Sequence, residues 1–210
     1  DGTLFDSPVD NEKNRQKYEQ ATGLPWIIDK ETSRRLSKEH SCHIGMRRGW
    51  WGRQETLEPP LVPDPAPMEW FKKEPCAAFL ESKKNPDSIT LLLTGRYSGL
   101  QRHVLRILGQ GGLMEVNKGT FPKSDRVFIT QADDNVAFFC LGDKALSSTV
   151  KNGPMPSETF PWKIWVIEQY LMLLPEITTV EVWEDRPEHV EKFKETLDGM
   201  VENVIVNHVQ

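Results

Sequence analysis

One hydrophobic stretch of the chain ends on residues that could bind an anion. Four of the five residues in 89–93 are apolar, and the run lacks the polar alternation of a half-exposed strand, which predicts a β-strand covered on both faces. Thr94 follows, and Ser98 can then cap a helix with one apolar stripe. Open α/β sheets bind ligands beyond the carboxyl ends of their strands, and the N–H groups of a starting helix attract anions. We therefore predict that Thr94 lies beside a bound anion.

A second predicted strand, residues 178–183, ends on two adjacent carboxylates. Glu184 and Asp185 follow it, and Pro187 suits the first turn of the amphipathic helix that comes next. Neighbouring carboxylates repel each other unless a positive charge lies between them, and Mg²⁺ prefers oxygen ligands. The pair is therefore a candidate magnesium site, although a solvated acidic turn explains these two residues equally well when they are taken alone.

Four short motifs follow one another in an order that resembles a known family. They are Asp1-Gly2-Thr3-Leu4-Phe5, Gly49-Trp50-Trp51, Thr94-Gly95-Arg96 and Glu184-Asp185-Arg186-Pro187-Glu188-His189. The set resembles the haloacid dehalogenase (HAD) phosphohydrolases, and more narrowly the Swiss Army Knife RNA-repair branch of that superfamily. Single motifs of this kind are weak signals, whereas their order along the chain is fairly specific.

The resemblance implies a single α/β domain with a Rossmann-like, doubly wound parallel sheet in three α/β/α layers. The likeness is strongest over residues 1–8, 49–113 and 160–209. In this superfamily a cap over the active site is inserted after the first motif, so we expect residues 9–70 to form an irregular, cap-like insertion whose prolines deny long helices. Residues 114–158 match no part of the family pattern and are expected to form a second insertion.

Two apolar runs within this second insertion, residues 126–130 and 136–141, suggest a small β-hairpin. A polar turn at residues 133–135 separates them. Asp133 and Asp134 could imitate a metal-binding pair, but a turn role explains both residues.

The first motif of the family leads to an expectation about the start of the chain. It reads Asp-x-Asp-Gly-Thr, in which the first aspartate is the nucleophile and the second is the general acid/base. Asp1 aligns with the second, so we expect the domain to be N-terminally truncated, with the nucleophile and its strand immediately upstream. Without that strand, which is normally central and buried, the 210 residues are expected to be inactive and poorly stable.

The resemblance also implies roles for individual residues. Asp1 would protonate the leaving oxygen, activate water and help to bind Mg²⁺. Thr94 and the amide of Gly95 would bind the phosphoryl oxygens, and Thr3 is assigned to the same substrate site. Arg96 could contact the substrate, and an ion pair with a neighbouring carboxylate is an equally good prediction.

Lys163 opens a predicted helix that runs to Leu174, where this superfamily places the lysine of its third motif. An ammonium there would offset the charge of the nucleophile and of the incoming phosphate. Its rivals are Lys118, Lys123 and Lys144, and position alone favours Lys163. Glu184 and Asp185 would hold Mg²⁺, and the pattern does not decide which of them binds it directly.

Trp50 and Trp51 lie in a locally basic part of the presumed cap, among Arg47, Arg48 and Arg53. Basic residues interleaved with indoles suit a surface that binds phosphates while a base stacks on an aromatic ring. The competing explanation, which we favour, is that both tryptophans are buried anchors and that the arginines form a solvated rim.

The composition excludes several classes of protein. The net charge of −5 argues against wholesale polyanion binding, and no apolar run approaches membrane-spanning length. The three widely spaced cysteines suit a reducing, intracellular environment rather than a disulfide framework. A zinc site at residues 40–43 is rejected because Cys76 and Cys140 offer no second pair of ligands.

The resemblance therefore predicts a Mg²⁺-dependent phosphohydrolase that acts on phosphorylated RNA or DNA ends in nucleic-acid repair, with no membrane partner. A fused or associated kinase or ligase could supply the other repair steps. Two alternatives stay open. One is a phosphatase for a small phosphomonoester, and the other is a non-catalytic HAD-fold module that binds a protein partner.

Overall fold

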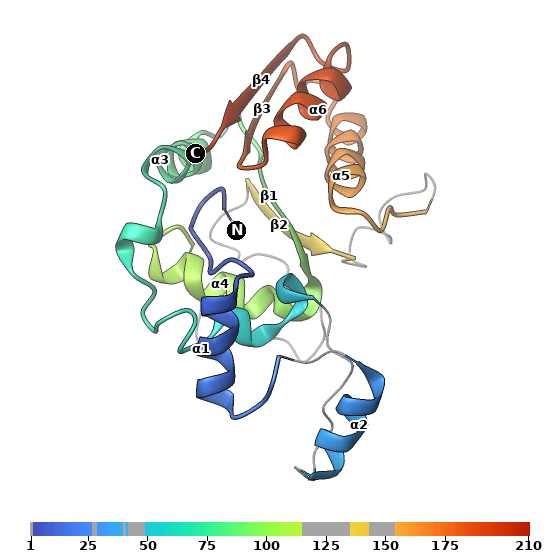
Figure 1. Ribbon diagram of the computed structural model, residues 1–210. Coiled ribbons are helices and arrows are strands. Elements are labelled where there is room, and N and C mark those ends of the chain that lie inside the picture. The colour runs from blue at the N-terminus through green and yellow to red at the C-terminus, as the bar shows by residue number, and fades with distance from the viewer. Residues whose placement is uncertain (1, 27–28, 40, 42–48, 115–134, 143–153) are drawn as a thin grey trace.

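A computed structural model of the chain describes residues 2–26, 29–39, 41, 49–114, 135–142 and 154–210. Within these ranges two α-helices come first, and from Lys73 onward α-helices and strands alternate (Figure 1). The helices are α1 (Glu12–Thr22), α2 (Lys30–Glu39), α3 (Lys73–Lys84), α4 (Gln101–Gln110), α5 (Thr159–Leu173) and α6 (Pro187–Leu197). The strands are β1 (Thr90–Tyr97), β2 (Val136–Leu141), β3 (Thr179–Glu184) and β4 (Asn203–His208). The short 3-10 helices are η1 (Trp50–Gly52), η2 (Gln54–Leu57), η3 (Met68–Trp70) and η4 (Ser98–Leu100).

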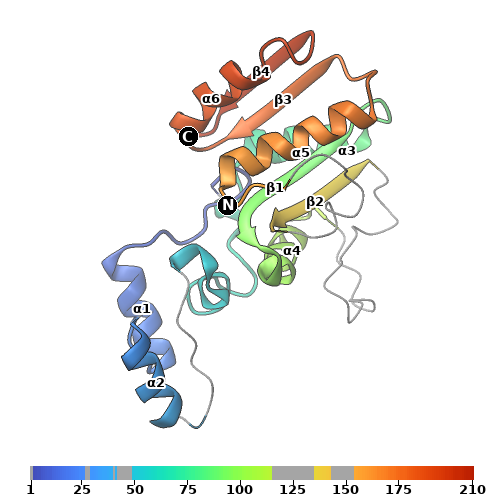
Figure 2. The ribbon, with the colours of Figure 1, turned by 90° about the vertical axis from the view of Figure 1, so that its right-hand side faces the viewer.

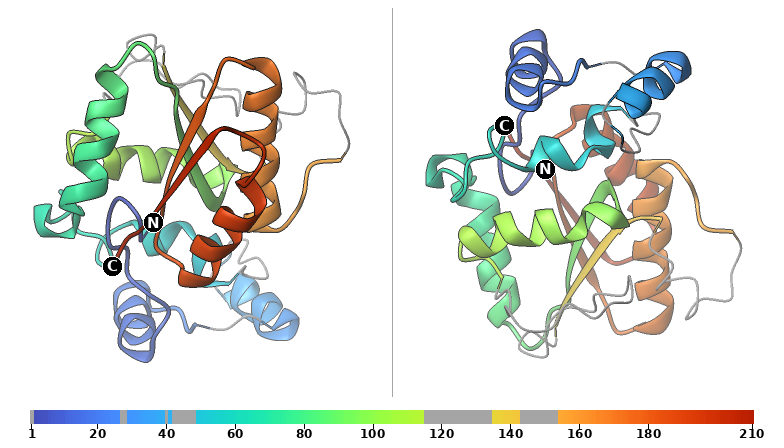
Figure 3. Two further views of the ribbon diagram at one scale, coloured as in Figure 1. Left: turned by 90° about the horizontal axis from the view of Figure 1, so that it is seen from above. Right: turned by 90° about the horizontal axis from the view of Figure 1, so that it is seen from below.

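The strands form two parallel pairs, β1 with β2 and β3 with β4. Figure 3 shows α3 and α4 on one side of the strands and α5 and α6 on the other. An α/β fold built on parallel strands is thereby confirmed. The single doubly wound sheet stays a prediction, because in the described ranges β1 and β3 share no hydrogen-bonded ladder.

Helices pack against both faces of the β1–β2 pair, as the unbroken apolar run predicted. On one face, Val104 and Ile107 of α4 are buried in a cluster with Phe138 of β2. On the other face, Trp162 of α5 packs with Leu93 of β1. This two-sided packing fixes the carboxyl end of β1, where Thr94 lies.

β2 belongs to the same sheet as β1, and this corrects the prediction that residues 136–141 form part of an inserted hairpin. The two strands run parallel, with Leu91 opposite Ala137 and Leu93 opposite Phe139. Parallel neighbours need a long connection rather than a tight turn. The predicted partner strand, residues 126–130, lies outside the described residues.

α5 joins the two strand pairs. Its Ile164 and Ile167 are buried with Phe193 and Leu197 of α6 against the β3–β4 pair, while Trp162 faces the β1–β2 pair. The carboxyl ends of β1 and β3 are therefore held relative to each other by one helix, which also carries Lys163.

The insertion over residues 9–70 is more regular than predicted. α2 was not foreseen, although no proline falls between Pro25 and Pro59, and the carboxylate of Asp29 caps the helix by accepting the N–H of Thr32 at 2.8 Å. Within the insertion, α1 is attached to the later part through buried Tyr18, which packs with Trp50 and Leu61. In the described part of the chain, no helix combines the length and apolar character needed to cross a membrane.

Candidate functional site

A cavity of about 1880 Å³ lies between β1 and β3. Residues from the carboxyl ends of both strands, from the start of α5 and from the N-terminal segment line it, and that segment lies beside the end of β3 (Figure 2). Of the residues singled out by the sequence, those that line the cavity are Thr3, Trp51, Thr94, Gly95, Arg96, Lys163, Glu184 and Asp185. Asp1, with its predicted catalytic and metal-binding roles, lies outside the described residues.

Lys163 and Glu184 form an ion pair at the cavity. The distance from Lys163 Nζ to Glu184 Oε2 is 2.6 Å, and the side chain of Glu184 is only 1% exposed. The second oxygen of Glu184 accepts the backbone N–H of Arg186 at 3.3 Å. A buried carboxylate is stable only when it is paired and hydrogen bonded, so Glu184 is committed to fixing the position of the lysine.

His189 completes the surroundings of Glu184. Its Nδ1 lies 3.7 Å from Glu184 Oε1, and its ring packs against Phe160 at the start of α5, with 5.2 Å between ring centroids. Burial lowers the pKa of His189, an effect that the charge of Glu184 opposes. The neutral imidazole therefore serves as packing for the ion pair.

Asp185 contacts the N-terminal segment. The hydroxyl of Thr3 donates to Asp185 Oδ1 at 3.0 Å. Gly2 has a φ of +80°, and a Cβ added there would lie 2.2 Å from Asp185 Oδ2. The first and last motifs of the chain therefore meet, and only glycine permits so close an approach of the backbone to the carboxylate.

Thr94 and Gly95 form the opposite wall of the cavity. Thr94 is buried at the end of β1, and its Oγ1 accepts the backbone N–H of Arg96 at 3.2 Å. This contact leaves the hydroxyl hydrogen of Thr94 able to donate to another group. A Cβ at Gly95 would lie 2.8 Å from Thr159 Oγ1, so glycine here lets the start of α5 approach β1 closely.

Arg96 connects β1 to the insertion. Its Nη1 donates to the backbone oxygen of Trp51 and to Thr56 Oγ1, both at 3.1 Å, and its side chain is 2% exposed. Burial lowers the pKa of Arg96 to about 10, so the guanidinium remains charged near neutral pH. These contacts give Arg96 a role in joining strand end and insertion, which neither prediction from the sequence included.

The two neighbouring tryptophans have different environments. Trp50 is buried, its Nε1 donates to the backbone oxygen of Pro8 at 2.7 Å, and its ring lies 4.9 Å from that of Trp26. Trp50 therefore has the buried position of the favoured explanation and not that of a substrate contact, because its ring is inside a hydrophobic cluster. Trp51 has 41% of its surface exposed and lines the cavity.

The arginines near these tryptophans do not form a solvated rim where they are described. Arg53 is buried, with its guanidinium carbon 3.1 Å from the centroid of the Trp26 ring. A cation over an indole face is a stabilising arrangement, so Arg53 stabilises the insertion. Arg47 and Arg48 lie outside the described residues.

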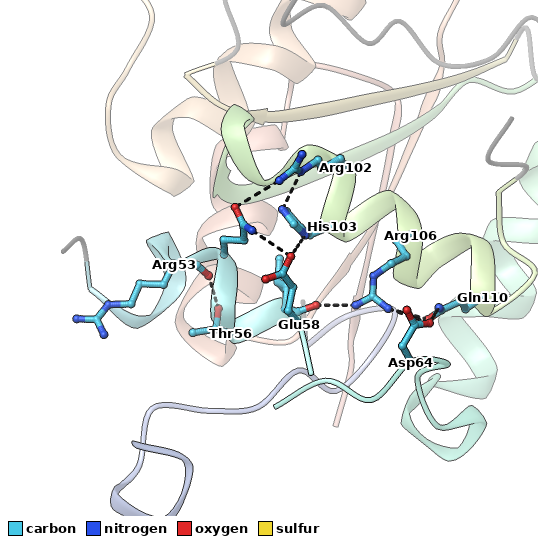
Figure 4. Close-up of polar contacts among 10 residues, drawn as sticks. Arg53, Thr56, Glu58, Asp64, Arg102, His103, Arg106 and Gln110 are labelled. Carbon is cyan, nitrogen blue, oxygen red and sulfur yellow. Dashed lines mark hydrogen bonds and ion pairs between the residues drawn. The ribbon is translucent and has the colours of Figure 1, made fainter. Parts of the chain in front are cut away.

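A polar network attaches the insertion to α4 (Figure 4). Nε2 of His103 accepts from Arg102 at 3.0 Å, and its Nδ1 lies 3.2 Å from Glu58 Oε1. Arg106 donates to the backbone oxygen of Leu57 at 2.7 Å. Burial lowers the pKa of His103, and a neutral imidazole matches its contacts, because one nitrogen accepts while the other donates.

Comparison with known families places the chain. The family model described as HAD domain family 1 in Swiss Army Knife RNA repair proteins matches residues 25–210. The chain belongs to this HAD family. The match includes Thr94, Lys163, Glu184 and Asp185, and it begins after the N-terminal segment. Neither a curated protein nor a solved structure matches the chain.

The side chains that could bind a metal ion in this HAD domain are few at the candidate site. Among the described residues, no group of three or more His, Cys, Asp and Glu side chains could hold a metal ion. Glu184 is bound to Lys163, whereas Asp185 makes no ion pair within those same ranges. Of the acidic pair, Asp185 is therefore the carboxylate without an ion pair in these ranges, and a magnesium site there would need a further ligand, such as the predicted Asp1.

Two residues of the HAD domain near the site were given no role from the sequence, although His189 is the last residue of the fourth motif. Thr159 packs against Gly95, and His189 lies beside Glu184. His189 could have been anticipated, because it falls in the first turn after Pro187 and so faces back toward the strand end. Thr159 carries no comparable signal, since its role depends on a contact with a residue far away in the sequence.

Proposed function

We propose that this HAD domain is the catalytic unit of a Mg²⁺-dependent phosphohydrolase that removes phosphate from RNA or DNA ends. One observation carries the proposal, which is that Thr94, Lys163 and Asp185 come from three separate elements and line one cavity. A hydroxyl, an ammonium and a carboxylate are the groups that a phosphate and a hard cation require. The RNA-repair proteins named in the family description support a nucleic-acid end as the substrate.

Lys163 is the proposed source of positive charge for the phosphate, and Glu184 is the residue that positions it. Their 2.6 Å contact keeps the ammonium at the cavity wall, where it needs little reorganisation when a phosphate binds. The hydroxyl of Thr94 and the amide of Gly95, at β1 in the same cavity, would bind phosphoryl oxygens.

Asp185 is the proposed magnesium ligand of the acidic pair, with Asp1 as its partner. Its carboxylate is held by the hydroxyl of Thr3 at 3.0 Å, and it has no cation of its own in the described ranges. When bound, Mg²⁺ supplies neutralisation of charge on the phosphoryl oxygens. We therefore propose Asp185 as the direct ligand, a choice between Glu184 and Asp185 that the sequence left open.

The nucleophile is proposed to come from a strand that lies between β1 and β3. In the described ranges β1 pairs only with β2, and β3 pairs only with β4, so one edge of each strand is available for another parallel strand. Gly2 and Thr3 lie next to Asp185, which follows the carboxyl end of β3. A strand directly preceding Asp1 would therefore place its last residues in the cavity, between Thr94 and Asp185.

The experiment measures phosphate release by the full-length protein. The substrates are an oligonucleotide phosphorylated at its 3′ end, the same oligonucleotide phosphorylated at its 5′ end, and a small phosphomonoester, each with Mg²⁺ and with a chelator. The proposal predicts Mg²⁺-dependent release with a higher kcat/KM on one of the two oligonucleotides. Equal kcat/KM on the small phosphomonoester would favour a metabolite phosphatase, and no release from any substrate would favour a non-catalytic module.

A further inference from the structure

We propose that Trp51 is the stacking platform for the terminal base of the substrate, and that it makes the site selective for nucleic-acid ends. The inference rests on the proposed function and adds the residue that recognises the base. Trp51 is 41% exposed and lines the same cavity as Thr94 and Lys163. Of the Phe, Tyr and Trp residues that line this cavity in the described part of the chain, Trp51 is the most exposed.

Trp51 is attached to the strand end that carries the proposed phosphate-binding threonine. Its backbone oxygen accepts from Arg96 Nη1 at 3.1 Å, and the backbone N–H of Arg96 donates to Thr94 Oγ1 at 3.2 Å. One arginine therefore contacts both the tryptophan and the threonine. A terminal nucleotide whose phosphate lies at Thr94 would have its base on the side of the cavity where Trp51 lies.

The backbone that carries Trp51 is fixed before any substrate binds. Trp50, its neighbour, is buried and hydrogen bonded to Pro8 at 2.7 Å. Within η1, the N–H of Gly52 donates to the oxygen of Gly49 at 2.9 Å. A platform held in place loses little conformational freedom when a base stacks on it, which favours binding.

The contact between Arg96 and Trp51 also helps to hold the indole ring in place. The guanidinium carbon of Arg96 lies 5.2 Å from the centroid of the indole, within the range of a cation–π interaction. Stacking on an indole tolerates any base, because every base has an aromatic face. The platform would therefore recognise the presence of a terminal base and not its identity.

The test compares two oligonucleotides that differ only in the terminal base. One carries a normal terminal nucleotide with the phosphate that the full-length protein removes, and the other has an abasic terminal nucleotide with the same phosphate. Stacking predicts that kcat/KM is about 5- to 150-fold higher for the first substrate, corresponding to about 1–3 kcal/mol. Trp51→Ala should abolish this preference by lowering kcat/KM on the normal substrate much more than on the abasic one, and Trp51→Phe should keep part of it.

Tyr97→Ala is the matched control, because Tyr97 is also 41% exposed near the end of β1 but does not line the cavity. It should retain the full preference for the terminal base. If wild type shows no such preference, or if Trp51→Ala keeps it, the platform is refuted while the phosphohydrolase proposal stands. Absence of phosphate release from every substrate by wild type would refute both.

Discussion

Replacing Lys163 with methionine removes one half of the ion pair at the cavity and leaves the other half in place. The Glu184 side chain is 1% exposed and that of Lys163 is 14% exposed, so water cannot readily take the place of the ammonium. Among the described residues, the other polar contacts of the Glu184 carboxylate are the N–H of Arg186 at 3.3 Å and Nδ1 of His189 at 3.7 Å, and neither carries a permanent positive charge.

The expected cost follows from this burial. Removing one partner of a buried ion pair typically lowers the free energy of unfolding by about 3–5 kcal/mol, because the other charge is left uncompensated. Adding Glu184→Gln should restore part of that loss, since an uncharged amide can still accept the N–H of Arg186. The double variant should therefore be more stable than the sum of the two single changes predicts, by about 1–3 kcal/mol.

Urea denaturation of the purified protein, followed by tryptophan fluorescence, measures these free energies. Lys194→Met is the matched control, because Lys194 pairs with Glu191 at 3.1 Å on an exposed face, with 51% and 69% of the side chains exposed. That change should alter the free energy of unfolding by less than about 1 kcal/mol. A Lys163→Met variant as stable as this control, or strictly additive effects in the double variant, would refute the role assigned to the ion pair.

Three further predictions concern packing and protonation. Gly2→Ala should destabilise the contact with Asp185, because the added Cβ would lie 2.2 Å from Oδ2 at a φ of +80°, and its loss of activity should exceed its loss of thermal stability. Trp50→Ala should lower the free energy of unfolding by about 3–5 kcal/mol, because Trp50 is buried. Trp51→Ala should change it by less than about 1 kcal/mol, because Trp51 is 41% exposed. Denaturation curves of both variants would test this contrast. Burial lowers the pKa of His103 in the folded state, so the unfolded state binds more protons below a pH of about 6.5. The free energy of unfolding should therefore fall as the pH drops below that value. A His103→Gln variant with the same pH dependence as wild type would contradict this.

Much of the fold could be predicted because its signals are local. The apolar run that became β1, the helix that begins at Pro187 and the strand that leads to Glu184 all have clear periodicity and clear ends. The position of β2 could not be predicted in the same way. The position of a parallel strand depends on partners distant in the sequence. The polar residues before residue 136 are also typical of a hairpin turn, and this led to the wrong prediction.

The site shows the same division between local and distant information. The sequence indicated Lys163, Glu184 and Asp185, but it could not show that the first two pair with each other and leave the third accessible. That difference arises because Glu184 is the buried last residue of β3, whereas Asp185 already lies in the bend that follows it. Likewise, the sequence around Trp50 and Trp51 does not show that a 3-10 helix buries the first side chain and leaves the second partly exposed.

The central claim, that Asp185 acts in phosphate removal at this cavity, is tested most directly by one kinetic comparison. The measurement is kcat/KM for Mg²⁺-dependent phosphate release from the preferred oligonucleotide by the full-length protein, in wild type, Asp185→Asn and Asp198→Asn. Asp198 is an exposed residue that does not line the cavity, and its substitution should leave kcat/KM unchanged. The account predicts that Asp185→Asn lowers kcat/KM by about 100-fold or more at unchanged thermal stability. An Asp185→Asn variant as active as Asp198→Asn would contradict it.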